Sequence, residues 1–232
     1  MAAFVAAFVR GLAGFGMAIL LVPLISLVIR PAEAVVVSNM LGLLIGLVGA
    51  RKVWNVGEKS AGVIGGLAML ITPVGLLALF ATPPAVARVV IALVAIGAFL
   101  MVLLPARPGH APGKVETGLT GAAAGLLTGF AGMPGPPVVP YYLRRPIPRD
   151  VARASMLTVF LLTSIASTTA ALVLRLASWH DALFALLLFL PVLIGNHLGA
   201  RAFGKVSDRA WRGFVGFLLA VSCFVALVRL LA

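Results

Sequence analysis

The chain has 232 residues, of which 62% are hydrophobic and 10% charged, and its mean hydropathy is +1.17. A soluble domain is nearer half apolar and about a quarter charged, so this chain could not cover its surface with polar groups and its solvent must be lipid. The net charge of +12 does not indicate a nucleic-acid partner, because the basic residues lie in short loops between apolar segments, where they orient a membrane protein. The single cysteine, Cys223, excludes an intramolecular disulfide and a cysteine-cluster metal site.

Eight apolar segments follow one another along the chain, without the period-2 alternation of barrel strands. We place them at about 1–29, 32–50, 60–81, 85–105, 114–143, 150–174, 181–201 and 210–231. A helix needs roughly 18–20 apolar residues to cross hydrocarbon, so the sequence predicts an all-α polytopic membrane protein. The first and fifth segments are too long for one straight span and too short for two, and glycines interrupt both. Each is expected to be a broken, tilted helix or a re-entrant hairpin.

The second four segments repeat the pattern of the first four. In each half a glycine turn precedes two prolines and a serine at steps of 8 and 7 residues: Pro23, Pro31 and Ser38, then Pro140, Pro148 and Ser155. Internal repeats of this kind are the usual construction of secondary transporters. We therefore divide the single transmembrane domain into a first repeat at 1–113 and a second at 114–232.

The distribution of charge favours hairpins. If segments one and five enter and leave on the same side, 13 of the 18 Lys and Arg residues share one face, and five remain for the other: Arg10, Arg30, Arg88, Arg175 and Arg229. That bias is expected of a cytoplasmic face and places both termini in the periplasm. Each half then crosses the membrane three times, so the two repeats are inverted.

The two glycine turns are the candidate site. Each would lie near mid-membrane, where the second arm of a hairpin starts as a helix with unpaired N–H groups and a positive dipole end. Two such ends would bind an anion without a buried charged side chain. The candidate residues are Gly14, Phe15, Gly16, Gly129, Gly132, Met133, Pro134 and Gly135. The alternative is that these glycines only let helices pack closely.

Few other polar groups lie inside the segments. Candidate substrate contacts are Ser38, Asn39, Ser155, Thr158 and Asn196, and candidate coupling residues are His197 and Arg201. A polar side chain in lipid is a functional candidate, although Ser and Thr often bond only to their own helix. The run of Ser and Thr from Thr163 to Thr169 is assigned to packing. All six acidic residues fall in loops or at segment ends, which disfavours a cation substrate.

The glycine turns and the residues after them carry a resemblance. The stretches from Gly11 to Pro23 and from Gly125 to Leu143 resemble the paired signatures of the sulfite exporter TauE/SafE family, although Gly-Phe-Gly-Met departs from its more glycine-rich first signature. The resemblance implies transport of sulfite, organosulfonates such as sulfoacetate, or related anions across the bacterial inner membrane.

The leading hypothesis is thus a secondary transporter, an exporter of sulfur-containing anions. The alternatives are an anion channel and a carrier of a non-sulfur carboxylate. An enzyme is disfavoured, since no nucleophile–base pair or metal cluster can be assembled, and no cofactor is expected. The expected partners are a small anion and the lipid bilayer, without nucleic acid, and a homodimer is left open.

Overall fold

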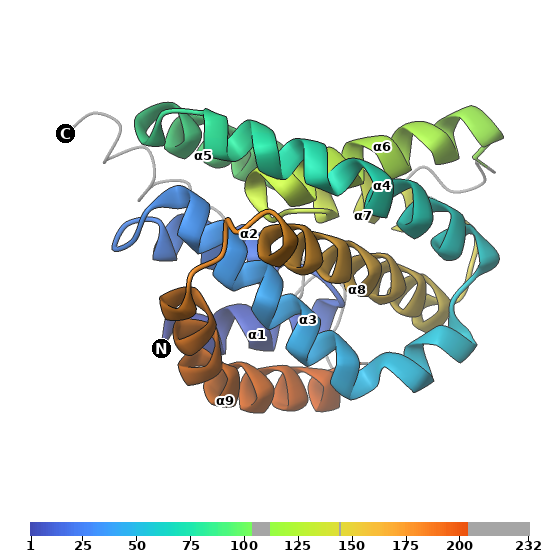
Figure 1. The fold of residues 1–232 in the computed structure, drawn as a ribbon. Coiled ribbons are helices and arrows are strands. Elements are labelled where there is room, and N and C mark those ends of the chain that lie inside the picture. The colour runs from blue at the N-terminus through green and yellow to red at the C-terminus, as the bar shows by residue number, and fades with distance from the viewer. Residues whose placement is uncertain (104–111, 144, 204–232) are drawn as a thin grey trace.

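The computed structural model describes residues 1–103, 112–143 and 145–203, and every regular element in these ranges is an α-helix (Figure 1). The helices are α1 (Ala2–Ala13), α2 (Met17–Ile25), α3 (Pro31–Val56), α4 (Lys59–Ala81), α5 (Pro84–Leu103), α6 (Lys114–Ala131), α7 (Gly135–Leu143), α8 (Arg149–Val173) and α9 (Trp179–Ala202). The all-α prediction is confirmed for this part of the chain. The predicted segment at 210–231, which contains Cys223, lies outside the described residues.

Four of the described helices are long and apolar enough to cross a membrane: α3, α4, α8 and α9. The most apolar window of α8 is 67% buried, whereas that of α9 is only 22% buried. Large leucines lie uncovered on the outer faces: Leu70 on α4 is 76% exposed and Leu187 on α9 is 75% exposed. Such apolar outer faces are stable only in lipid, so this is a multi-pass membrane protein.

The first and fifth predicted segments are each broken into two helices at glycines. Helix α1 ends at Gly14 with φ of 84°, α2 begins after Gly16 with φ of 99°, and α6 ends at Gly132 with φ of 69°. These left-handed conformations are readily adopted only by glycine. At 1.5 Å per residue, α1 and α2 are only about 18 and 14 Å long, well short of the roughly 30 Å hydrocarbon core. The predicted breaks are confirmed.

Two capping boxes set where long helices begin. Before α3, the Arg30 backbone N–H donates to the Glu33 carboxylate at 3.1 Å, and Pro31 occupies the first turn, where its missing N–H costs nothing. Before α9, the Ser178 N–H and hydroxyl donate to Asp181 Oδ2, and the Asp181 N–H donates back to Ser178 Oγ. These caps fix the starts of α3 and α9 within two residues of those predicted, whereas α3 continues to Val56 beyond its predicted end at 50.

The helices are held together by close backbone contacts across the two halves. Figure 1 shows α3 and α8 side by side in the middle, α1 with α9 along the lower edge, and α4 with α6 along the upper edge. Glycines make the edge contacts: Gly195 and Gly199 of α9 lie against the Phe4 and Phe8 carbonyls, and Gly129 of α6 lies against the Thr72 carbonyl. Small residues let membrane helices approach in this way.

We expect Gly129→Ala to lower the melting temperature of the detergent-solubilised protein, because the new methyl group would overlap the Thr72 carbonyl oxygen and the Leu76 backbone nitrogen. Overpacking of this kind costs about 1–3 kcal/mol. Gly118→Ala is the matched control on the same helix, since nothing lies within 4 Å of its Cβ position. Equal melting temperatures for the two variants would contradict the packing role of Gly129.

Candidate functional site

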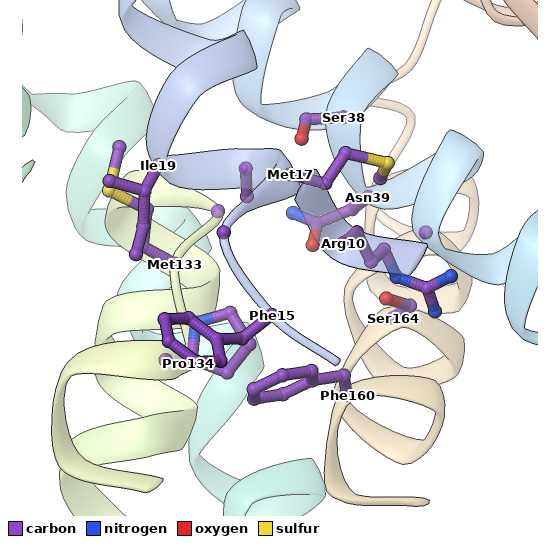
Figure 2. A pocket seen from close by; sticks show the side chains of 15 residues that line it. Arg10, Phe15, Met17, Ile19, Ser38, Asn39, Met133, Pro134, Phe160 and Ser164 are labelled. Atoms are coloured by element: carbon purple, nitrogen blue, oxygen red, sulfur yellow. The ribbon is translucent and has the colours of Figure 1, made fainter. Parts of the chain in front are cut away.

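The two helix breaks meet at a cavity of about 50 Å³, which we call the break cavity (Figure 2). Its lining comes from α1 (Arg10), the first break and α2 (Phe15, Gly16, Met17, Ala18, Ile19), α3 (Ser38, Asn39, Gly42), the second break and α7 (Gly132, Met133, Pro134, Gly135), and α8 (Phe160, Ser164). This volume has room for a small ion or for about three water molecules. Segments more than a hundred residues apart thus line one small site.

Two helices begin at the wall of this cavity. Met17 and Gly135, the first residues of α2 and α7, both line it, and no side chain caps the N-terminus of α2. The first N–H groups of a helix have no partner within the helix, and its N-terminal end carries a partial positive charge. In α7 the second and third residues, Pro136 and Pro137, carry no N–H, so this start contributes the Gly135 N–H and the helix dipole, whereas α2 contributes the N–H groups of its first turn. The positive ends of these two helices therefore favour the binding of an anion in the break cavity.

Ser38 and Asn39 of α3 add side-chain donors. The Ser38 side chain is buried, with only 2% of the residue exposed, and its hydroxyl has no hydrogen-bond partner in the described protein. A buried hydroxyl without a partner is costly, so a ligand or water is expected beside it. Asn39 Nδ2 donates to the Thr128 carbonyl at 3.4 Å, which ties α3 to the last turns of α6.

Arg10 corrects two predictions. The charge count assigned Arg10 to one membrane face, and the site was expected to contain no buried charge. Instead Arg10 is only 6% exposed and lines the break cavity, and its Nη1 donates to Asn196 Oδ1 at 3.1 Å. The reason is that α1 ends within the protein, which places a residue four positions before Gly14 beside the break.

The Arg10 guanidinium has no acidic partner in the described ranges, and no carboxylate is among the residues lining the break cavity. A buried cation is costly unless an anion accompanies it. Arg10 was missed because it was counted as a loop charge. Its position inside an apolar segment was the available signal.

The structure brings some of the predicted residues together and separates others. Phe15, Gly16, Ser38, Asn39, Gly132, Met133, Pro134 and Gly135 line the break cavity, whereas Gly14, Gly129, Ser155 and Thr158 do not. Gly14 lies against the Arg153 side chain, and Gly129 lies against α4.

The two predicted residues of α8 face the connection between α3 and α4. The Ser155 hydroxyl donates to the Val151 carbonyl at 2.8 Å and accepts from the Glu58 N–H at 2.9 Å. Thr158 Oγ1 donates to the Ala154 carbonyl at 3.0 Å. In this structure both hydroxyls are occupied by protein groups.

Asn196 and His197 line a second, larger cavity of about 610 Å³, which we call the vestibule. It lies between the second half of α3, the first half of α8 and the end of α9. Arg201 is exposed and is not among its lining residues. Arg10 lines both the vestibule and the break cavity.

Phe160 and Ser164 are cavity residues that the sequence did not single out. The Ser164 hydroxyl lies against Gly42, where a Cβ would come within 2.6 Å of Oγ. The sequence placed Ser164 in a packing cluster, because a run of Ser and Thr along one helix does not show which member faces a neighbouring loop. Its neighbours Ser167 and Thr168 remain buried away from the cavity lining.

Apolar helices around a small cavity lined by Arg10 and two helix starts define a multi-pass membrane protein suited to handling a small anion. The family described as sulfite exporter TauE/SafE matches residues 1–225, and the chain belongs to this family of transporters. No curated protein and no solved structure matches the chain.

We expect Ser38→Ala to weaken sulfite binding by about tenfold or more, because a hydrogen bond to a charged ligand contributes about 1.5–3 kcal/mol. Titration calorimetry of the purified protein with sulfite measures the effect. Ser26→Ala is the control, since the Ser26 hydroxyl is buried and bonded to the Pro23 carbonyl at 2.8 Å. Unchanged affinity in Ser38→Ala would remove this hydroxyl from the site.

Proposed function

We propose that this protein is a secondary transporter that exports sulfur-containing anions, sulfite or organosulfonates, across the bacterial inner membrane, with the break cavity as its substrate site. The observation that carries the proposal is the convergence of Arg10, the unpartnered Ser38 hydroxyl and the starts of α2 and α7 on one cavity. All of these groups offer hydrogen-bond donors or positive charge.

Sulfite and the sulfonate group suit this donor set. Each presents three oxygens that accept hydrogen bonds, and charge-assisted bonds from a guanidinium are among the strongest available. The apolar remainder of the cavity wall, including Phe15, Met17 and Phe160, would contact the carbon part of an organosulfonate. At about 50 Å³, the cavity holds the charged head group rather than a long chain.

Contacts between the halves support inverted repeats at 1–113 and 114–232. In the first half the broken segment is α1 with α2, and its α1 packs on α9 of the second half. In the second half the broken segment is α6 with α7, and its α6 packs on α4 of the first half. The helices that follow the two broken segments, α3 and α8, pack on each other. This exchange is expected when two equivalent halves are related by a two-fold axis, and the charge bias favours an axis in the membrane plane, which inverts one half relative to the other.

The charge bias favours a vestibule that opens to the cytoplasm, since it lies near the ends of α3, α8 and α9 that carry the larger share of Lys and Arg. An exported anion would then enter through the vestibule and bind in the break cavity. Rocking of the halves about the α3–α8 contact would expose the site to the periplasm. A homodimer stays a prediction.

Counterflow tests this proposal. Liposomes loaded with unlabelled sulfite should accumulate radiolabelled sulfite transiently and saturably. Arg10→Gln should abolish this counterflow, whereas Arg10→Lys should retain part of it, because lysine keeps the charge but loses the planar fork. The amount and monodispersity of each variant are checked by size exclusion. Current through the protein without saturation or counterflow would identify an anion channel instead.

The coupling residue remains a prediction, with His197 as the candidate. His197 lines the vestibule together with Arg10, Arg153 and Asp150. We expect His197→Gln to retain sulfoacetate binding and to lose any stimulation of flux by a pH gradient, because glutamine keeps hydrogen-bonding capacity but does not titrate. Transport of sulfoacetate with and without the gradient measures this, and full stimulation in the variant would make His197 a structural residue.

A further inference from the structure

The wall of the vestibule contains two arginines from different helices. Arg10 comes from α1 and Arg153 from the first turns of α8, and both line this space. Arg10 also lines the break cavity, so one guanidinium belongs to both spaces. The two cavities therefore share the positively charged Arg10 side chain in their walls.

Arg153 is held in place on three sides. Its Nη2 donates to the Gly11 carbonyl at 2.6 Å, and its guanidinium carbon lies 4.7 Å from the centre of the Phe203 ring. The aliphatic part of its side chain lies against Gly14: a Cβ added to Gly14 would come within 2.7 Å of Arg153 Cγ. Its buried Nε has no hydrogen-bond partner in the described protein, so one donor of a fixed guanidinium remains unused.

The charges of Arg10 and Arg153 repel each other. Neither forms an ion pair with an acidic side chain within residues 1–103, 112–143 and 145–203. Asp150 is the acidic residue among those lining the vestibule, but it is exposed. Two partly buried like charges without a counterion are unfavourable, and a bound anion would relieve that cost.

We propose that the vestibule contains a second anion site, in which Arg153 and Arg10 together hold a sulfite or sulfonate group before it passes, along Arg10, into the break cavity. The inference rests on the proposed function and extends it to a two-site path. Arg10 is the shared ligand, so an anion can leave Arg153 without being released into an uncharged space. The aromatic ring of Phe203 and the fixed Gly11 contact keep the Arg153 guanidinium in position for this role.

A purely structural role for Arg153 makes a different prediction. The guanidinium lies near the C-terminal end of α1, where a positive charge is favourable with the helix dipole. In that case the residue would stabilise the protein without attracting anions to the vestibule. The local electrostatic potential and the protection by substrate distinguish the two roles.

Thiol labelling in the vestibule is the first test. Val53 lines the vestibule, so Val53→Cys in a Cys223→Ser background places one thiol there. We expect an anionic methanethiosulfonate reagent to label this thiol about tenfold faster than a cationic one of similar size, because a cleft of one charge concentrates counterions. Sulfoacetate should slow labelling by a neutral reagent. Equal rates for the two charged reagents, or no protection, would overturn the proposal.

Arg153 variants of the Val53→Cys, Cys223→Ser protein test whether Arg153 causes the preference for the anionic reagent. Arg153→Gln should remove most of the preference for the anionic reagent and weaken protection by sulfoacetate about tenfold, whereas Arg153→Lys should retain the preference. The labelling rate with a neutral reagent reports whether the vestibule keeps its shape. Arg51→Gln is the charge-matched control, because Arg51 is exposed on α3 and is not among the vestibule residues. A preference unchanged in Arg153→Gln would overturn the role of Arg153.

These outcomes separate the second site from the proposed function. Saturable sulfite counterflow by the unsubstituted protein, together with equal labelling by both charged reagents, would reject the second site and leave the transporter standing. Charge-selective labelling with sulfoacetate protection, but without counterflow, would support the second site and reject the carrier mechanism. If Arg153→Gln does not remain monodisperse, labelling of the Val53→Cys protein with Arg153 intact and the Arg153→Lys variant still decide the question.

Discussion

The constraint on which the site depends is that two helices begin inside the protein rather than at its surface. In lipid a free backbone N–H is expensive, so irregular backbone at this depth persists only where it lines a protein-enclosed space. The left-handed glycines at 14, 16 and 132 make the breaks sterically accessible, and the starts of α2 and α7 then face one cavity. A ligand that accepts hydrogen bonds fits this backbone better than one that donates them.

Arg10 belongs to the same arrangement. Because α1 stops at Ala13, a cation near its end cannot reach the membrane surface and instead lies between the break cavity and the vestibule. Its hydrogen bond to Asn196 ties it to α9, the helix on which α1 packs. Motion between the halves would therefore change the surroundings of Arg10.

The glycines perform two distinct tasks in this fold. Gly14, Gly16 and Gly132 adopt backbone conformations that other residues rarely adopt, while Gly129, Gly195 and Gly199 lie against carbonyls of neighbouring helices. The first group shapes the breaks, and the second lets α1 approach α9 and α6 approach α4. Glycine therefore shapes the breaks at some positions and allows close helix packing at others, and Gly129 belongs to packing in this structure.

The sequence by itself determined the membrane class, the starts of the long described helices, the two glycine breaks and the family signatures, because hydropathy and glycine turns are local properties of the chain. Only the tertiary structure decided which polar groups meet. Ser38 and Ser155 hold corresponding places in the repeat, yet Ser38 lines the break cavity while Ser155 bonds to the Glu58 N–H. Arg10 changed from a loop charge to a buried one because α1 ends within the protein and packs on α9, whose Asn196 accepts a hydrogen bond from it. A side chain's partner comes from segments distant in the chain, so its role follows from helix packing that local pattern does not contain.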